Sequence, residues 1–184
     1  MQTKKAIQVG DCILDGKHIY IQSMLNTRSD DIVGSVAQAV ALEQAGCEIL
    51  RAAIPDKEAL KLIPAIKEAV SIPLVADIHF DYRLALEAVA AGIDKIRINP
   101  GNIGGMDRVK QVVKACQSRN IPIRIGVNSG SLEKDLLAKY GAPTAPALVE
   151  SAMRHVKMLE DCDFTDIVIS MKSSTVSTMI DAYR

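Results

Sequence analysis

Three segments of the chain alternate polar residues with branched aliphatic ones, which is the pattern of a β-strand. The segments span residues 73–79, 94–100 and 121–128. Side chains alternate between the two faces of a strand, so every second residue shares a face. The polar side chains that share a face are Asp77 with His79, Arg97 with Asn99, and Arg124 with Asn128. Parallel sheets covered by helices are normally apolar on both faces, so a polar face of this kind predicts a ligand.

The alternating segments belong to a strand-then-helix unit that recurs along the chain. Strands are expected at residues 19–24, 48–53, 74–79, 95–99, 123–127 and 166–171. Helical patterns are expected between them, at residues 31–45, 56–69, 82–91, 106–119, 132–140 and 145–161. The second of these helices contains Pro64, where we expect a bend. A short hairpin is expected ahead of the first unit, over residues 6–17.

Six parallel strands joined by crossover helices fit either a doubly wound sheet or a (β/α)8 barrel. The barrel is favoured because nearly every strand carries polar residues, whereas a doubly wound sheet gathers its ligand groups at one switch point. No GxGxxG motif follows the first strand, so a dinucleotide site has little support. A complete barrel has eight strands and typically roughly 250 residues. We therefore expect an α/β fold in which residues 1–184 form an incomplete TIM-type barrel, the front portion of a larger protein.

Composition narrows the class of protein. The chain has 22 basic and 22 acidic residues, which argues against a nucleic-acid or membrane-surface binder that acts through bulk charge. We find neither a signal peptide nor an apolar run of the roughly 20 residues that a membrane helix needs, and therefore expect a cytoplasmic protein. The cysteines are widely spaced and form no CxxC pair, so we expect reduced thiols and no metal ligands in this chain. They are Cys12, Cys47, Cys116 and Cys162.

Basic residues recur at or near the carboxyl ends of the expected strands. They are Arg51, Arg97, Arg124 and Lys172. Cations gathered in a partly desolvated site repel one another unless an anion joins them, and arginine binds phosphate through paired hydrogen bonds. The pattern predicts a substrate with one or two phosphate groups. For any single arginine the alternative is a salt bridge across the barrel, for instance between Asp77 and Arg97.

The other polar residues near the strand ends have two interpretations each. Asn99 and Asn128 can bind substrate hydroxyls or phosphate oxygens, or else cap the loops that follow them. His79 is a candidate proton donor or hydrogen-bonding anchor, and the alternative is a packed core histidine. Weaker candidates for the floor of the site are Gln22, Ser23, Met24 and Asn26. His155 is expected at the surface of a helix, without a role.

Longer strings of sequence carry a resemblance to a known family. They are IQSMLNT at 21–27, ADIHFDYR at 76–83, KIRINPGNIG at 95–104, IRIGVNSGSLEK at 123–134 and DIVISMK at 166–172. In this order they closely resemble the bacterial 4-hydroxy-3-methylbut-2-enyl diphosphate synthases, over essentially the whole chain. The resemblance implies an oxidoreductase of the non-mevalonate isoprenoid pathway. Its reaction is the reductive ring opening of 2-C-methyl-D-erythritol 2,4-cyclodiphosphate, with loss of water.

The same resemblance implies cofactors and partners. In the family, flavodoxin or ferredoxin supplies electrons through a [4Fe-4S] cluster, which is held by three cysteines and a glutamate in a C-terminal domain. That domain is absent from this chain. None of the four cysteines of this chain matches the cluster ligands of the family. The family forms a homodimer in which one subunit's cluster closes over the barrel of the other. The resemblance therefore implies that this chain is the substrate-binding barrel and is inactive alone.

By motif position, the resemblance also implies roles for the residues at the strand ends. Substrate binding falls on Arg51, Arg97, Asn99, Arg124, Asn128 and Lys172, and the catalytic candidates in the same pocket are Asp77 and His79. Two rival interpretations remain. One is a pterin-binding barrel of the dihydropteroate synthase type, which shares this strand-end composition. The other is a catalytically inactive fragment that serves binding or assembly.

Overall fold

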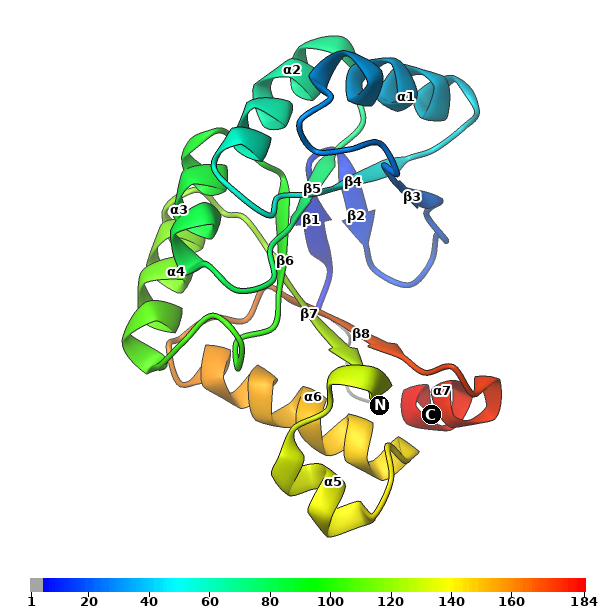
Figure 1. Ribbon diagram of the computed structural model, residues 1–184, viewed down its shortest axis with the longest axis vertical. Helices are drawn as coiled ribbons and strands as arrows, with labels where there is room; N and C mark the ends of the chain where they lie inside the picture. The colour runs from blue at the N-terminus through cyan, green and yellow to red at the C-terminus, as the bar shows by residue number, and fades with distance from the viewer. Residues whose placement is uncertain (1–4) are drawn as a thin grey trace.

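The fold is a parallel sheet that curls into a half-barrel, with helices on its outer side (Figure 1). The structure is a computed structural model that describes residues 5–184. The sheet has six strands in the order of the sequence: β3 (Gln22–Met24), β4 (Ile49–Ala53), β5 (Leu74–Asp77), β6 (Lys95–Ile98), β7 (Ile123–Asn128) and β8 (Ile167–Lys172). The expectation of an incomplete TIM-type barrel is confirmed.

Helices follow the strands along the outer face of the sheet. They are α1 (Ile32–Gln44), α2 (Leu62–Ala69), α3 (Tyr82–Ala90), α4 (Met106–Ser118) and α6 (Ala145–Glu160). In addition, α5 (Lys134–Tyr140) packs against α6, and α7 (Val176–Tyr183) lies beside the end of β8. Two short 3₁₀ turns accompany them, η1 (Glu58–Lys61) and η2 (Ser129–Ser131). The helix expected over residues 56–69 consists of η1 followed directly by α2, and this change of helix type falls two residues before Pro64. Pro64 is the third residue of α2, where its missing N–H costs no intrahelical hydrogen bond.

The core lies between the sheet and this helical layer. Aliphatic residues on the outward face of the strands are fully or almost fully buried there, and they include Leu50, Leu74, Ile96, Ile98, Ile123 and Ile125. The alternate residues of the same strands face the inside of the half-barrel. The strand parity read from the sequence thus separates an apolar core from a polar interior. No helix within residues 5–184 combines the length and the apolar character that crossing a membrane requires.

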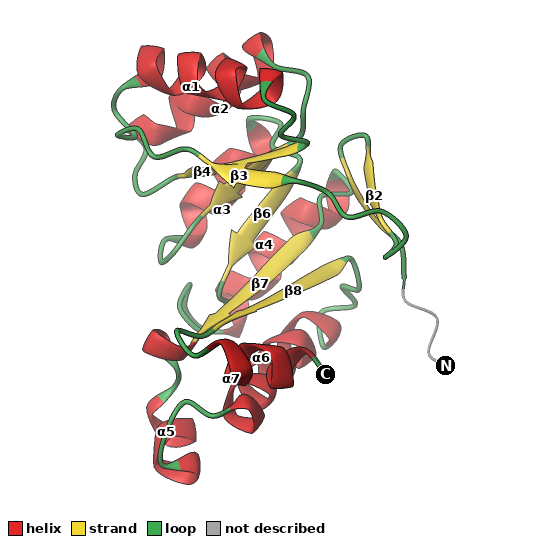
Figure 2. Ribbon diagram, turned by 90° about the vertical axis from the view of Figure 1, so that its right-hand side faces the viewer, coloured by secondary structure: helices red, strands yellow, loops and turns green. Residues whose placement is uncertain are grey.

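The expected hairpin is formed by β1 (Ile7–Val9) and β2 (Cys12–Leu14), which pair antiparallel. Figure 2 shows it beside the amino-terminal ends of the strands. Cys12 packs there in a small apolar cluster with Ile49 and Val75, at the starts of β4 and β5. The hairpin therefore covers the end of the half-barrel opposite the carboxyl ends of the strands.

One expectation about α6 is wrong. His155 was expected at the surface, but it is buried, with 3% of the residue exposed. The buried residues of this helix recur with helical spacing and include Leu148, Ser151, Ala152, His155 and Leu159. His155 stands one turn after Ser151 and one turn before Leu159, so helical periodicity assigns it to the buried face.

Candidate functional site

The carboxyl ends of the strands surround a cleft of about 420 Å³ on the inner side of the half-barrel. Its lining comprises Met24, Arg51, His79, Arg97, Arg124, Asn128, Ser170, Met171, Lys172 and Tyr183. A smaller hollow of about 260 Å³ adjoins it and shares three of these residues. The smaller hollow is lined by His79, Phe80, Arg97, Asn99, Asn102, Gly126, Asn128 and Ser131. The residues predicted to bind substrate, and His79, therefore each line one of these two spaces.

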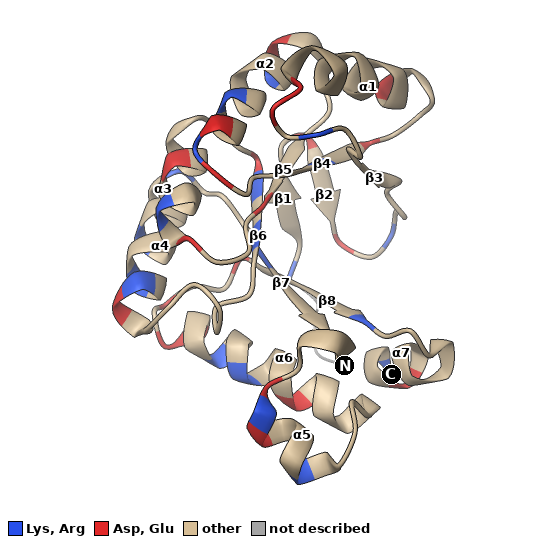
Figure 3. Ribbon diagram, viewed as in Figure 1, with Lys and Arg blue, Asp and Glu red and all other residues tan. Residues whose placement is uncertain are grey.

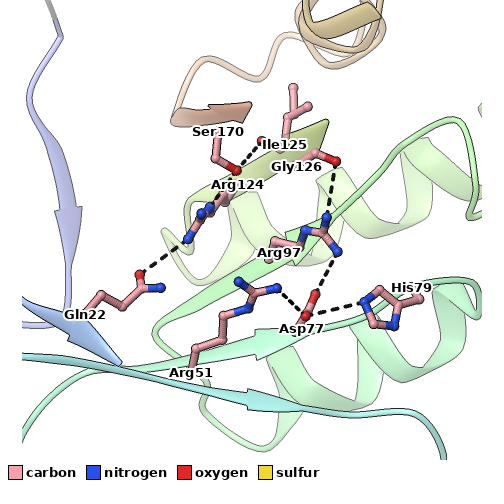
Figure 4. Close-up of polar contacts among 9 residues, drawn as sticks. All are labelled: Gln22, Arg51, Asp77, His79, Arg97, Arg124, Ile125, Gly126 and Ser170. Carbon is pink, nitrogen blue, oxygen red and sulfur yellow. Dashed lines mark hydrogen bonds and ion pairs between the residues drawn. The ribbon is translucent and has the colours of Figure 1, made fainter. Parts of the chain in front are cut away.

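Asp77 lies beneath the cleft and joins the residues around it (Figure 4). The residue is 2% exposed, and its carboxylate accepts hydrogen bonds from the guanidinium groups of Arg51 and Arg97. The bond from Arg97 Nη1 to Asp77 Oδ1 is 3.0 Å long. His79 Nε2 lies 3.4 Å from Asp77 Oδ2. The salt bridge between Asp77 and Arg97, the alternative interpretation from the sequence, is thus present, and it places both arginines at the cleft.

Arg124 and Lys172 differ from that group because no carboxylate within residues 5–184 pairs with either. Arg124 Nε donates to Ser170 Oγ at 2.9 Å, and its Nη1 donates to Gln22 Oε1 at 3.5 Å. Burial, followed by the charges of Arg51 and Arg97, lowers the pKa of Arg124. Of the four weaker candidates, Gln22 contacts Arg124 and Met24 lines the cleft, whereas Ser23 and Asn26 line neither space.

Lys95 is a cation of the same interior that our sequence reasoning missed. The residue is 2% exposed, and burial, followed by the charge of Arg124, lowers the pKa of its ammonium to about 8. The signal was available, because Lys95 precedes Arg97 by two residues on β6 and so shares its face. Figure 3 shows basic positions along β6, β7 and the end of β8, while most acidic positions lie on helices and loops.

We expect Lys95→Met to raise the free energy of unfolding at pH 7. The lowered pKa means that the unfolded chain holds a proton between pH 8 and 10.5 that the folded chain lacks, so this group makes stability rise with pH across that window. Below pH 8 the buried charge is fully destabilising, by about 3 kcal/mol. Chemical denaturation of both chains at pH 7 and pH 10 measures the difference. A variant less stable than the parent at pH 7 would contradict this prediction, because it would show that the buried ammonium of Lys95 makes favourable interactions that outweigh the cost of its burial.

His79 and the two asparagines occupy the mouth of the site. The side chain of His79 is 49% exposed, so the alternative of a packed core histidine is wrong. Asn99 Oδ1 accepts a hydrogen bond from the backbone N–H of Gly101 at 3.0 Å, so this residue does cap its loop. Asn128, the last residue of β7, lines both the cleft and the smaller hollow.

Gly126 leaves the space that the Arg97 guanidinium occupies beside Asp77. A Cβ at Gly126 would lie 2.2 Å from Arg97 Nε, and the Gly126 carbonyl accepts a hydrogen bond of 3.2 Å from Arg97 Nη2. Sequence reasoning did not single out this glycine, because its importance comes from a side chain on the neighbouring strand.

We expect Gly126→Ala to displace the Arg97 side chain and to lower the free energy of unfolding by about 1–3 kcal/mol, the scale of overpacking a filled interior. Thermal unfolding followed by circular dichroism measures the loss. Gly130→Ala is the control, because a Cβ at Gly130 meets nothing within 4 Å. Equal stability of the two variants would mean that the guanidinium relocates at no cost.

A larger hollow of about 490 Å³ lies at the opposite end of the half-barrel, between the hairpin and the strand starts. Its acidic residues are already paired. Asp94 contacts Lys67 at 2.7 Å, and Asp166 contacts Lys5 at 2.5 Å. Arg119 is the one cation among the residues that line this space, which therefore lacks the gathered cations of the cleft.

The described residues do not fit a metal cluster. Within residues 5–184 no three His, Cys, Asp or Glu side chains come together as a metal-binding group. The free cysteines lie far apart in the sequence, and three of them are buried. Burial also raises the pKa of Cys116 to about 12, which disfavours the thiolate that a metal would bind.

Comparison with known proteins places the whole chain in one group. The family described as the GcpE TIM-barrel domain matches residues 4–184. The "4-hydroxy-3-methylbut-2-en-1-yl diphosphate synthase (flavodoxin)" of Listeria monocytogenes is 55% identical over 183 residues, which are 99% of this chain and 50% of that protein. The protein of the same name from Clostridium perfringens is 58% identical over 184 residues, or 100% of this chain and 52% of that protein. The chain thus spans about half the length of these relatives.

Solved structures support the fold at a greater distance. A dihydropteroate synthase of Xanthomonas albilineans aligns with 97% of this chain and 69% of its own, with a TM-score of 0.61 and 16% identity. At that identity the likeness extends to the barrel architecture alone. It gives no support to the pterin-binding alternative.

Proposed function

This chain belongs to the GcpE TIM-barrel family, and from that premise we propose that it is the substrate-binding barrel of a 4-hydroxy-3-methylbut-2-enyl diphosphate synthase. The substrate is 2-C-methyl-D-erythritol 2,4-cyclodiphosphate, which the complete enzyme opens reductively in the non-mevalonate isoprenoid pathway. The observation that supports this proposal is the charge of the interior. Lys95, Arg51, Arg97 and Arg124 face this interior, where Asp77 is the only buried carboxylate within residues 5–184.

The excess of cations suits a cyclic diphosphate, in which each of the two phosphates carries negative charge. Arg124 and Lys172, which have no carboxylate partner within the described residues, are the first candidates to bind phosphate oxygens. Arg51 and Arg97 keep their contacts with Asp77 and present their remaining N–H groups. Asn99 and Asn128 line the adjoining hollow and bind the hydroxyl groups of the substrate.

Asp77 and His79 are the proposed catalytic pair. Loss of water from the substrate requires a proton at the departing hydroxyl oxygen, and a histidine at the mouth of the cleft is suited to supply it. Asp77, 3.4 Å from His79 Nε2, orients the imidazole ring. Asp77 thereby links the proton donor to the arginines that hold the phosphates.

The electrons come from outside this chain. We propose that a C-terminal domain of the longer protein carries the [4Fe-4S] cluster and that flavodoxin or ferredoxin reduces it. A homodimer in the cytoplasm, with one subunit's cluster domain over the other's barrel, completes the enzyme. The cluster supplies the two electrons of the ring opening. The 184-residue chain then binds substrate without turning it over.

Calorimetric titration of the 184-residue chain with the cyclodiphosphate tests the proposal, once circular dichroism has shown that the chain is folded. We expect binding that weakens as salt is added, because charge-assisted contacts are screened. A pterin is the control and should neither bind nor compete. A folded chain that does not bind the cyclodiphosphate would refute the assignment of the substrate site to these residues.

A further inference from the structure

Helix α6 carries a buried polar cluster, behind the smaller hollow, for which the proposed mechanism has no role. Ser151 and His155 are 1% and 3% exposed, and Glu133 lies opposite them. Ser151 Oγ donates to Glu133 Oε1 at 3.0 Å, and His155 Nε2 lies 3.2 Å from the same oxygen. Glu133 Oε2 and His155 Nδ1 are buried without a hydrogen-bond partner among the described residues.

The cluster lies directly against a turn of the substrate site. A Cβ at Gly101 would lie 2.7 Å from His155 Nε2 and 3.4 Å from Asn99 Oδ1. The turn is closed by two hydrogen bonds, from Gly101 N to Asn99 Oδ1 at 3.0 Å and from Asn102 N to Asn99 O at 2.9 Å. Figure 1 shows this connection between β6 and α4 beside α6.

Both sides of the smaller hollow meet at this cluster. Asn99 and Asn102 line the hollow from the turn, and Ser131 lines it from η2. Glu133 follows Ser131 by two residues, at the start of α5. The contact between Glu133 and His155 therefore joins the two loops that border the hollow to the buried face of one helix.

The charge state of the cluster fits a positioning role. Burial lowers the pKa of His155, Glu133 acts in the opposite direction, and Arg154 adds to the lowering. Arg154 itself is paired with Asp135 and Glu150 on the outside of the helix. The ring is thus neutral near pH 7 and packs closely against the backbone of Gly101. A nucleophilic role for Ser151 does not fit, because the residue is buried and lines neither the cleft nor the smaller hollow.

We propose that His155 and Glu133 are positioning residues that hold the turn of Asn99–Asn102 in the geometry that the substrate meets. The claim that this turn contacts the substrate rests on the proposed function. The claim that His155 and Glu133 support the turn does not. Protein interiors are closely packed, so a change in the size of the side chain at position 155 should shift the backbone of Gly101 beside it.

Amide hydrogen exchange, measured by NMR on the 184-residue chain, tests the support without any ligand. We expect His155→Ala to speed exchange at Gly101 and Asn102 by about tenfold, since local opening sets exchange in such turns. His155→Gln places an amide nitrogen near the position of Nε2 and should restore most of the protection. Val156→Ala, a buried truncation on the same helix, is the control and should lower the unfolding temperature without affecting these two amides.

A double-mutant comparison separates contact from general destabilisation. Gly101→Ala introduces a methyl group against the ring and should disturb the turn by itself. In the His155→Ala background the same methyl group enters the vacated space, so the second change should cost much less than the first. Additive effects, or unchanged exchange at Gly101 and Asn102 in both single variants, would overturn the proposal. Gly101→Ala and His155→Gln provide the test if His155→Ala does not fold.

Titration with the cyclodiphosphate then links the turn to the site. We expect His155→Ala to weaken binding about tenfold, the scale on which misplaced binding groups act, and His155→Gln to restore it. If the parent chain binds no cyclodiphosphate, the proposed function fails while the exchange results still decide the support of the turn. A parent that binds and a His155→Ala variant with a loosened turn but equal affinity would refute the link to substrate.

Discussion

Replacing Asp77 with asparagine should lower the free energy of unfolding by about 3–5 kcal/mol, the usual cost of removing one partner from a buried ion pair. Asp77 is the carboxylate that both Arg51 and Arg97 contact, and it is 2% exposed. Its neutralisation leaves these arginines beside Lys95 and Arg124 with no opposing charge among them. Urea denaturation at pH 7 measures the loss.

Two comparisons make this result specific. Asp30→Asn removes an acid whose partner, Arg28, is exposed at the surface, and should leave the denaturation midpoint unchanged. Sulfate should stabilise Asp77→Asn more than it stabilises Asp30→Asn, because an anion replaces the missing charge. Equal stability of Asp77→Asn and the parent would contradict the prediction, because it would show that solvent stabilises the charges of Arg51 and Arg97 without Asp77.

Replacing Arg124 with alanine should weaken cyclodiphosphate binding by about 2–5 kcal/mol, the scale for losing a buried charge-assisted contact. The folded structure itself needs this guanidinium little, because its hydrogen bonds go to the neutral side chains of Ser170 and Gln22. Its removal also relieves repulsion from Arg51 and Arg97, which act to lower its pKa. We therefore expect stability to be kept or to rise while affinity falls.

Calorimetric titration and thermal unfolding of the same preparation separate these two effects. Arg119→Ala, which removes a cation from the hollow at the opposite end, should bind as the parent does. The salt dependence of binding should also be shallower for Arg124→Ala, since one charged contact is lost. An affinity equal to that of the parent would remove Arg124 from the site.

The sequence predicted the strands and the face on which each polar residue lies, because the two-residue period of a strand is local information. It did so for Arg97 and Arg124, which come from different strands and lie opposite each other in the register of β6 and β7. Lys95 obeys the same parity. It was missed because a lysine at the start of a strand looks like a solvated end, whereas the hairpin closes that end of the half-barrel.

Other features depend on contacts between distant segments and have no local signature. The need for glycine at position 126 comes from Arg97 on the neighbouring strand. The burial of His155 could be read from the period of α6, but its contacts with Glu133 and Gly101 could not. Contacts of this kind join loops from different strand–helix units, so they can be identified only in the folded structure.

The order of the strands in the sheet has a consequence for how the molecule is made. Strands β3 to β8 lie side by side in the order in which they occur in the sequence, and each pairs with its successor. A nascent chain leaving the ribosome can therefore add one unit at a time to an edge that already exists, without waiting for a distant segment. Each completed helix covers the strand pair behind it while the next strand is still being translated. The half-barrel is suited to vectorial, co-translational assembly.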